Sequence, residues 1–253
     1  MTDLTGKNVV VLGASGSVGT VVVRRVLAEG AHVLAVARHR SGLDSLARDV
    51  AGVAVLQLDA TLDDAPARVF QALPPDVLPD VLIVCGGAKP PGGPIKDLTW
   101  AQFSVNWESD VKMAFSFCRA ALAKPLPGGS VVILISSGAA LGGSPISGGY
   151  AGAKRTQMFI ANYSQKESDR LGLGIRFIAL APSMIMPDTD LGKFAVEHYA
   201  EYLGMPAADF VRSIKSPQTP LDVAEAVIQL AAGRHGGQGS VFTVSKEGIA
   251  GVP

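Results

Sequence analysis

Short apolar runs alternate along this chain with longer segments in which apolar residues recur at helical spacing. The runs are rich in valine, isoleucine and leucine and show no polar alternation, which is typical of strands buried on both faces of a parallel sheet. We predict strands at residues 8–12, 31–37, 53–58, 81–85, 131–135, 175–179 and 240–244. Helices are predicted at residues 18–29, 43–49, 65–73, 100–122, 149–171 and 221–232.

This alternation of strands and helices predicts a single α/β domain over residues 1–253. Successive parallel strands require right-handed crossovers, which place helices on both faces of the sheet. The expected fold class is therefore a doubly wound, Rossmann-like and mostly parallel seven-stranded sheet. Two proline-rich stretches, at residues 73–79 and 89–94, are interpreted as rigid surface connections and not as linkers between domains.

Composition narrows the classes of partner. The formal net charge is zero and only 17% of the residues are charged, so neither nucleic acid nor an anionic membrane is expected as a partner. The first residues lack a signal peptide and no apolar run reaches membrane-spanning length, so we expect a cytoplasmic protein. Cys85 and Cys118 have no C-x-x-C spacing and the four histidines are scattered, so we expect reduced thiols and no metal site.

A glycine-rich turn follows the first predicted strand. Gly13, Gly16 and Gly19 have the spacing G-x-x-G-x-x-G, and the first predicted helix opens inside this turn. Glycines allow close approach of the backbone, while the unpaired N–H groups of a helix start attract a pyrophosphate. The strand, turn, helix and next strand together predict dinucleotide binding. The alternative is a chance triplet in a chain that contains 29 glycines.

A hydroxyl, a phenol and an amine that together could move one proton occur at Ser137, Tyr150 and Lys154. Tyr150 and Lys154 share one face of a predicted helix, because they are four residues apart. A tyrosine ordinarily titrates near pH ~10, and a cation held beside it stabilises the phenolate. The alternative is an ordinary amphipathic tyrosine beside a solvated lysine.

Several unusual residues directly follow predicted strands. Asp59 comes after the third strand, Gly86 after the fourth, Ser137 after the fifth and Pro182 after the sixth. Since parallel sheets bind ligands outside the carboxyl ends of their strands, these residues predict one binding site. Each of them could instead cap a turn or a helix.

With these residues the chain resembles the short-chain dehydrogenase/reductase family over nearly its whole length. The resemblance rests on the glycine turn at residues 13–19, on Asp59, on Ser137 and, thirteen residues later, on Tyr150 with Lys154. It implies that Ser137 orients the substrate, that Tyr150 exchanges a proton with it, and that Lys154 assists Tyr150 and holds the nicotinamide ribose. We predict cofactor contacts from Gly13, Ser15, Gly16, Val18, Arg38, Asp59, Gly86, Tyr150, Lys154, Pro182 and Ile185.

The chain also departs from the family pattern. The glycine turn has a shorter first interval, and V-C-G-G at residues 84–87 replaces the family's N-N-A-G. A gap-free alignment puts Asp110, and not Asn106, at the family's fourth catalytic position, an asparagine that serves a water relay near the lysine. An aspartate there would pair with Lys154 and weaken the pull of that lysine on Tyr150.

The end of the second predicted strand bears on the choice of cofactor. A carboxylate there would hydrogen-bond the ribose hydroxyls of NAD, but this chain has Ala37, followed by Arg38 and Arg40. Arginines offer permanently charged donors suited to a phosphate, so NADP is predicted and NAD is the alternative. The arginines could instead solvate a loop.

Residues 142–149 and 184–214 occupy the places where family members build the substrate pocket. We expect residues 184–215 to cover a small-molecule carbonyl or alcohol substrate of hydrophobic character, although their apolar side chains could equally serve packing. The apolar side chains of residues 184–215 are Met184, Ile185, Met186, Phe194, Tyr199, Tyr202 and Phe210.

The resemblance also implies a homodimer or homotetramer that pairs through the predicted helices at 100–122 and 149–171.

The resulting hypothesis is an NADP-dependent oxidoreductase that interconverts a ketone and a secondary alcohol by hydride transfer, with Tyr150 as general acid and base. Two alternatives stay open. Asp110 and the altered glycine turn would suit a catalytically weak, NADP-sensing binding or regulatory protein. A nucleotide-sugar epimerase or dehydratase would share the glycine spacing, but the chain leaves little room for the additional substrate domain expected there.

Overall fold

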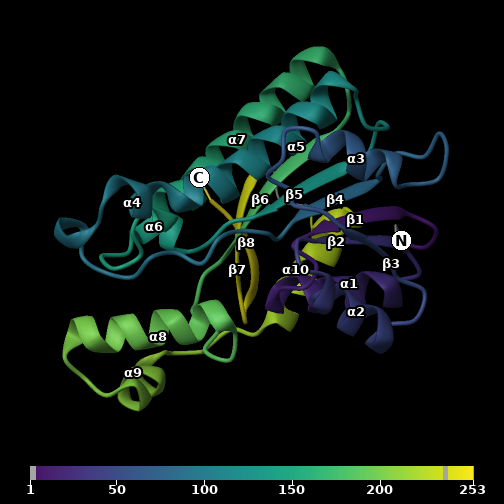
Figure 1. Ribbon diagram of the computed structural model, residues 1–253. Helices are drawn as coiled ribbons and strands as arrows, with labels where there is room; N and C mark the ends of the chain where they lie inside the picture. Colours follow the sequence, from purple (N-terminus) through teal and green to yellow (C-terminus); the bar gives the residue numbers. More distant parts are fainter. Residues whose placement is uncertain (1–3, 236–238, 253) are drawn as a thin grey trace.

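One mixed sheet forms the centre of the protein (Figure 1). Within residues 4–235 and 239–252, which a computed structural model describes, this sheet has eight strands in the order β3-β2-β1-β4-β5-β6-β7-β8. All neighbouring strands are parallel except β7 and β8, which are antiparallel. The strands are β1 (Asn8–Leu12), β2 (His32–Ala37), β3 (Ala54–Gln57), β4 (Val81–Val84), β5 (Val131–Ile135), β6 (Arg176–Pro182), β7 (Val241–Ser245) and β8 (Gly248–Gly251).

The seven predicted strands are confirmed, but β8 is an eighth, so the predicted seven-stranded sheet is wrong by one strand. β8 has the sequence GIAG and only its isoleucine is partly buried. It pairs with β7 from Phe242, which lies opposite Gly251, to Ser245, which lies opposite Gly248. Because two of its four residues are glycines, it carries almost no hydrophobic pattern, and its conformation depends on backbone pairing with β7.

Helices cover both faces of the sheet, as the crossovers predict (Figure 1). Successive residues of β1 belong to opposite cores, with Val9 and Val11 on the side of α1 and Val10 and Leu12 on the side of α5. This explains the apolar runs without polar alternation. One face carries α1 (Ser17–Ala28), α2 (Arg40–Asp49) and α10 (Pro220–Ala231), and the other carries α3 (Ala65–Gln71), α5 (Lys112–Ala123) and α7 (Tyr150–Leu171).

The helix predicted at residues 100–122 is interrupted. It begins as α4 (Trp100–Asn106), where Thr99 and Gln102 form a capping box, and passes through a π-helical turn at Trp107–Val111 before α5. Single π-helical turns often occur at functional sites. Asn106 and Asp110 are both fully buried at this interruption. The remaining short elements are a 3-10 turn (Ile95–Asp97) and α6 (Ala139–Gly142).

The segment at residues 184–215 contains two helices that its apolar pattern did not resolve, α8 (Asp190–Leu203) and α9 (Ala207–Ser213). Both stand to one side of the sheet and its helical layers (Figure 1). α8 begins where the Thr189 hydroxyl accepts a hydrogen bond from the N–H of Gly192. None of the helices in the described ranges is long and apolar enough to cross a membrane.

Candidate active site

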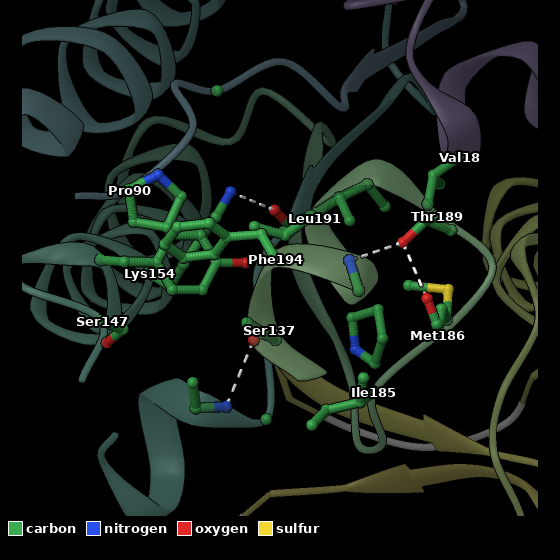
Figure 2. Close-up of a pocket in the computed structure, with 18 of the residues that line it drawn as sticks. Val18, Pro90, Ser137, Ser147, Lys154, Ile185, Met186, Thr189, Leu191 and Phe194 are labelled. Atoms are coloured by element: carbon green, nitrogen blue, oxygen red, sulfur yellow. Dashed lines mark hydrogen bonds between the residues drawn. The ribbon is translucent and has the colours of Figure 1, made fainter. Parts of the chain in front are cut away.

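A cavity of about 580 Å³ lies at the carboxyl ends of β1, β4, β5 and β6 (Figure 2). Its wall combines the start of α1, the loop after β4, the loop between β5 and α7, and the segment that leads into α8. Figure 2 shows residues from these parts, among them Val18, Pro90, Ser137 and Ile185. All four side chains predicted to be catalytic line the cavity: Ser137, Tyr150, Lys154 and Asp110.

The turn after β1 depends on glycines that have no space for a side chain. Gly13 has a φ of +75°, and a Cβ there would lie 2.5 Å from the Cα of Gly86, just after β4. A Cβ on Gly19 would overlap the carbonyl oxygen of Gly13. The turn therefore brings the start of α1 directly against the ends of two strands.

The start of α1 fits a phosphate group. Its N-cap residue is Gly16, which has no side chain to cap the first N–H groups, and the first turn contains no acidic residue. Gly16, Ser17 and Val18 line the cavity, so this uncapped helix start borders open space. A helix start with unclaimed N–H groups and no negative charge suits the pyrophosphate of a dinucleotide.

Ser137 and Tyr150 are oriented by the backbone around them. Ser137 follows β5, and its Oγ accepts a hydrogen bond from the N–H of Ala139 at 3.2 Å, which leaves its hydroxyl proton for donation. Tyr150 is the first residue of α7. A Cβ on the preceding Gly149 would overlap the carbonyl oxygen of Phe103, so α4 packs directly against this helix start.

Lys154 is a buried ammonium with two fixed hydrogen-bond acceptors. Its Nζ lies 3.0 Å from the carbonyl oxygen of Ile135 and 3.0 Å from Oδ1 of Asp110, and 5.7 Å from the centre of the Tyr150 ring. Burial alone would lower the pKa of Lys154, but attraction to Asp110 and Tyr150 outweighs it and raises that pKa. Lys154 is therefore protonated at neutral pH and has one N–H bond left for a ligand.

Asp110 holds its charge inside the protein. Burial alone would raise its pKa, but the Lys154 ammonium and hydrogen bonds lower that pKa. Its Oδ2 accepts hydrogen bonds from the hydroxyl of Ser109 at 2.6 Å, the N–H of Ala88 at 3.0 Å and the amide of Asn106 at 3.2 Å. Its Oδ1 has no other hydrogen-bond donor among the described residues and is compensated by the charge of Lys154.

Asp110, which the gap-free alignment puts at the fourth catalytic position, lies at ion-pair distance from the Lys154 ammonium. Asn106 lies one helical turn earlier and donates to the carbonyl oxygen of Ala88 at 2.8 Å and to Asp110. Gly87 is required here, since a Cβ at that position would lie 2.5 Å from Oδ1 of Asp110. Gly87 is the glycine that V-C-G-G shares with N-N-A-G, and it makes room for the carboxylate.

Four of the residues predicted to contact the cofactor lie outside the cavity wall. Asp59 accepts hydrogen bonds from the N–H of Thr61 at 3.0 Å and from its hydroxyl at 2.7 Å, and these bonds lower its pKa. This is the turn-capping role left open for Asp59. The four residues are Gly13, Ser15, Arg38 and Asp59, whereas Gly16, Val18, Gly86, Tyr150, Lys154, Pro182 and Ile185 line the cavity.

The two arginines after β2 differ in their surroundings. Arg40 forms an ion pair with Asp44 at 2.7 Å. Arg38 donates to the His39 ring at 3.3 Å, and within the described residues no carboxylate lies at ion-pair distance from it. Of the two side chains, Arg38 is therefore the better placed to bind a phosphate.

Neither cysteine is ionised at neutral pH. Burial raises the thiol pKa of Cys85 to about 12 and that of Cys118 to about 12. Both are free thiols. In the part of the chain that is described, no three side chains of histidine, cysteine, aspartate or glutamate gather closely enough to hold a metal ion.

Sequence reasoning missed three residues of the site, Lys89, Ser109 and Thr189. Lys89 lines the cavity, and the two prolines after it were the available signal, since they restrict its backbone. Thr189 also lines the cavity, and its position just before the α8 pattern is that of an N-cap. Ser109 contacts Asp110 within the π-helical turn, which no glycine or proline marks in the sequence.

Known proteins resemble this chain in sequence and in fold. An uncharacterised oxidoreductase of Mycobacterium tuberculosis is 30% identical over 185 residues, which cover 70% of this chain and 67% of that protein. L-xylulose reductase of Bos taurus is 30% identical over 135 residues, which cover 53% of this chain and 54% of that protein. A crystal structure of 3-ketoacyl-(acyl-carrier-protein) reductase from Brucella melitensis with NADH superimposes with a TM-score of 0.76 at 20% identity, covering 94% of this chain and 96% of that one.

The sequence profile of the short chain dehydrogenase family matches residues 7–200. This range contains the glycine turn and the three residues that carry the resemblance, Ser137, Tyr150 and Lys154. The sequence match covers residues 7–200, and the similarity of fold covers 94% of the chain. The protein belongs to the short-chain dehydrogenase/reductase family of NAD(P)-dependent oxidoreductases.

Proposed function

We propose that this protein interconverts a ketone and a secondary alcohol with NADP(H), using Tyr150 as general acid and base. One observation carries the proposal: the buried Lys154 ammonium lies 5.7 Å from the centre of the Tyr150 ring, beside a cavity that Ser137 also lines. The attraction between Tyr150 and Lys154 contributes to the raised pKa of the lysine. The same attraction stabilises a phenolate, which a tyrosine needs in order to exchange a proton near neutral pH.

Each side chain has a distinct task in this reaction. Bound NADPH supplies the hydride for ketone reduction. Ser137 donates its hydroxyl proton in a hydrogen bond to the carbonyl oxygen and so orients it toward Tyr150. Tyr150 donates its phenolic proton to that oxygen, and Lys154 stabilises the phenolate left behind. In alcohol oxidation the proton moves in the opposite direction.

Lys154 also serves cofactor binding in this proposal. Two of its N–H bonds point to Ile135 and Asp110, and the third can donate to a hydroxyl of the nicotinamide ribose. The uncapped start of α1 would hold the pyrophosphate through backbone N–H groups. These contacts need no rearrangement of the buried pair.

A catalytically weak, NADP-sensing protein is the second candidate. It is favoured by the carboxylate of Asp110, which opposes the charge of Lys154 at 3.0 Å. Turnover of a panel of ketones and secondary alcohols, with NADP(H) and NAD(H) in parallel, separates the candidates. Turnover supports the oxidoreductase, whereas cofactor binding without turnover of any compound would favour the sensor.

We expect NADPH to bind more tightly than NADH, and Arg38→Asp to reverse this order. The substitution removes a cation that would meet the 2′-phosphate and adds a carboxylate suited to ribose hydroxyls. A charged hydrogen bond of this kind contributes about 1.5–3 kcal/mol, so NADPH affinity should fall at least tenfold. Fluorescence titration with both cofactors measures the change.

Arg48→Asp is the matched control for this experiment. It makes the same change of charge at an exposed position of α2, away from the active-site cavity. NADPH preference should survive in this variant. An order of affinities that stays the same in Arg38→Asp would contradict the assignment of Arg38 to the phosphate.

We expect a homodimer or homotetramer that assembles through α5 and α7. Aromatic side chains stand exposed on these two helices: Phe115 is 55% accessible, Phe159 64% and Tyr163 60%. Phe159 and Tyr163 lie side by side, with ring centres 5.8 Å apart. Exposed aromatic clusters are typical of interfaces.

Sedimentation velocity at micromolar concentration tests this assembly, and Phe159→Glu should shift the protein toward the monomer because it places a charge in the interface. Arg48→Glu, a change of charge at an exposed position of α2 on the other side of the sheet, is the control. A wild-type protein that stays monomeric would contradict the expectation.

We also propose that residues 184–215 cover the substrate. Met184, Ile185, Leu191, Phe194 and Tyr199 from this segment line the cavity. The hydroxyl of Tyr199 donates to Oγ of Ser144 at 2.8 Å, which ties α8 to the loop before Tyr150. Phe210 supports Tyr199 by stacking on its ring, with centres 5.5 Å apart.

A further inference from the structure

Lys89 gives the substrate side of the cavity a positive charge without a counter-charge. Four charged side chains line the cavity: Lys89, Asp110, Lys154 and Asp190. Asp110 and Lys154 neutralise each other at 3.0 Å. Asp190 is the first residue of α8, where the positive end of the helix dipole compensates a carboxylate. Among the described residues, no carboxylate lies within 4.0 Å of the Lys89 ammonium.

The backbone that carries Lys89 is fixed on both sides. The N–H of Ala88 donates to Asp110 at 3.0 Å, and the carbonyl oxygen of Ala88 accepts from Asn106 at 2.8 Å. Pro90 follows Lys89, and the residue before a proline is restricted to an extended backbone. Farther along the loop, the N–H of Gly93 donates to the carbonyl oxygen of Ile146 at 3.0 Å. Lys89 thus projects from a loop that is anchored to the catalytic centre.

The head of Lys89 is placed by an aromatic ring. Its Nζ lies 4.9 Å from the centre of the buried Phe194 ring in α8. A contact of this kind contributes about 0.5–1 kcal/mol at an exposed site, enough to favour one position without cancelling the charge. Figure 2 shows Phe194, Leu191 and Pro90, which line the cavity with it.

The surroundings select the kind of anion. Lys89 is exposed in the free protein. A substrate that packs against the apolar wall beside it displaces water from the ammonium, so its anion is attracted more strongly than at an open surface. A single ammonium acts as a point charge and suits one carboxylate, whereas phosphate sites more often use an arginine fork or several donors. The described wall near Lys89 contains no arginine.

We propose that Lys89 binds a carboxylate of the substrate. The preferred substrates are then keto acids and hydroxy acids in which an apolar chain separates the carboxylate from the reacting carbon. This inference rests on the proposed function, because the reacting carbon is taken to lie at Ser137 and Tyr150. It also changes the hydrophobic substrate predicted from the sequence into one with an apolar middle and two polar ends.

Levulinate and its two next longer homologues, each compared with its methyl ester, test the proposal. The measured quantity is the ratio of kcat/KM for each acid to that of its ester. Lys89→Met keeps an unbranched chain against Phe194 and removes the charge. Lys193→Met is the matched control. Lys193 is the neighbour of Phe194 in the sequence but does not itself line the cavity, and the substitution removes the same charge.

We expect the wild type and Lys193→Met to favour at least one acid over its ester, and Lys89→Met to lower that ratio about tenfold. An unchanged ratio in Lys89→Met, or a wild type that favours every ester, would overturn the role of Lys89. If the protein reduces the ketone of the methyl esters but not that of the acids, the role of Lys89 is wrong and the proposed ketone reduction still holds.

If no compound is turned over, calorimetry on the NADPH-loaded protein measures the binding of the same acids and esters and tests the carboxylate site directly. Acid binding that weakens in Lys89→Met but not in Lys193→Met supports the carboxylate site while the proposed reaction fails. Equal acid binding in both variants overturns the site.

Discussion

Tyr150→Phe is expected to lower kcat for ketone reduction about a thousandfold while leaving NADPH affinity nearly intact. The substitution removes only the phenolic oxygen, which is the proposed proton donor. The ring remains at the start of α7, so the shape of the cavity and the position of Lys154 are kept. Steady-state kinetics measure the loss of turnover, and a fluorescence titration measures NADPH binding.

Tyr163→Phe is the matched control on the same helix. Tyr163 is 60% exposed and does not line the cavity, so its variant should keep the turnover of the wild type. Full activity in Tyr150→Phe would mean that another group moves the proton. The hydride-transfer mechanism proposed here would then be wrong, and the NADP-sensing protein or another reaction would take its place.

The sequence predicted the sheet well because burial on both sides leaves a strong signal. Val9 and Val10 belong to opposite cores, and the central strands β1, β4 and β5 are accordingly apolar at nearly every position. The glycine turn was equally visible, since Gly13 and Gly19 allow no side chain for steric reasons. Elements of this kind are specified by their own residues and are therefore readable without a structure.

Other features depend on contacts between distant segments. β8 is ordered by pairing with β7, and the helix before α5 changes to a π-helical turn without any glycine or proline to mark it. The position of the Lys89 ammonium depends on α8, which brings the Phe194 ring to 4.9 Å from it. Asp110 could be predicted as a partner of Lys154, but the hydrogen bond from Ser109 could not.

The second large effect is expected at the buried pair. Asp110→Asn should lower the free energy of unfolding by about 3–5 kcal/mol at neutral pH, because it leaves the Lys154 ammonium buried without its counter-charge. The side chain of Lys154 is only 7% exposed and that of Asp110 1%. Denaturant unfolding measures the loss. Asp97→Asn, which breaks the exposed pair with Lys96, should cost less than about 1 kcal/mol.

The stability difference between the wild type and Asp110→Asn should depend on pH. The pKa of Asp110 is lowered in the folded protein, so its stabilisation is present above the ordinary value of ~3.9 and is lost as pH falls through the folded pKa. The pKa of Lys154 is raised, so its stabilisation is present below ~10.4 and is lost as pH rises through the folded pKa. The difference should be largest between about pH 4 and 10 and should narrow in acid.

Asp110→Asn should also move the pH–rate profile of alcohol oxidation toward lower pH. In the proposed mechanism oxidation uses Tyr150 as a base, and the carboxylate of Asp110 opposes the attraction between Lys154 and the phenolate. Removing that negative charge strengthens the attraction between Lys154 and the phenolate, so the profile should move toward lower pH. A profile identical to that of the wild type would mean that the charge of Asp110 does not act on Tyr150. In that case the buried carboxylate has a structural role, and the observation that favours a catalytically weak sensor loses its force.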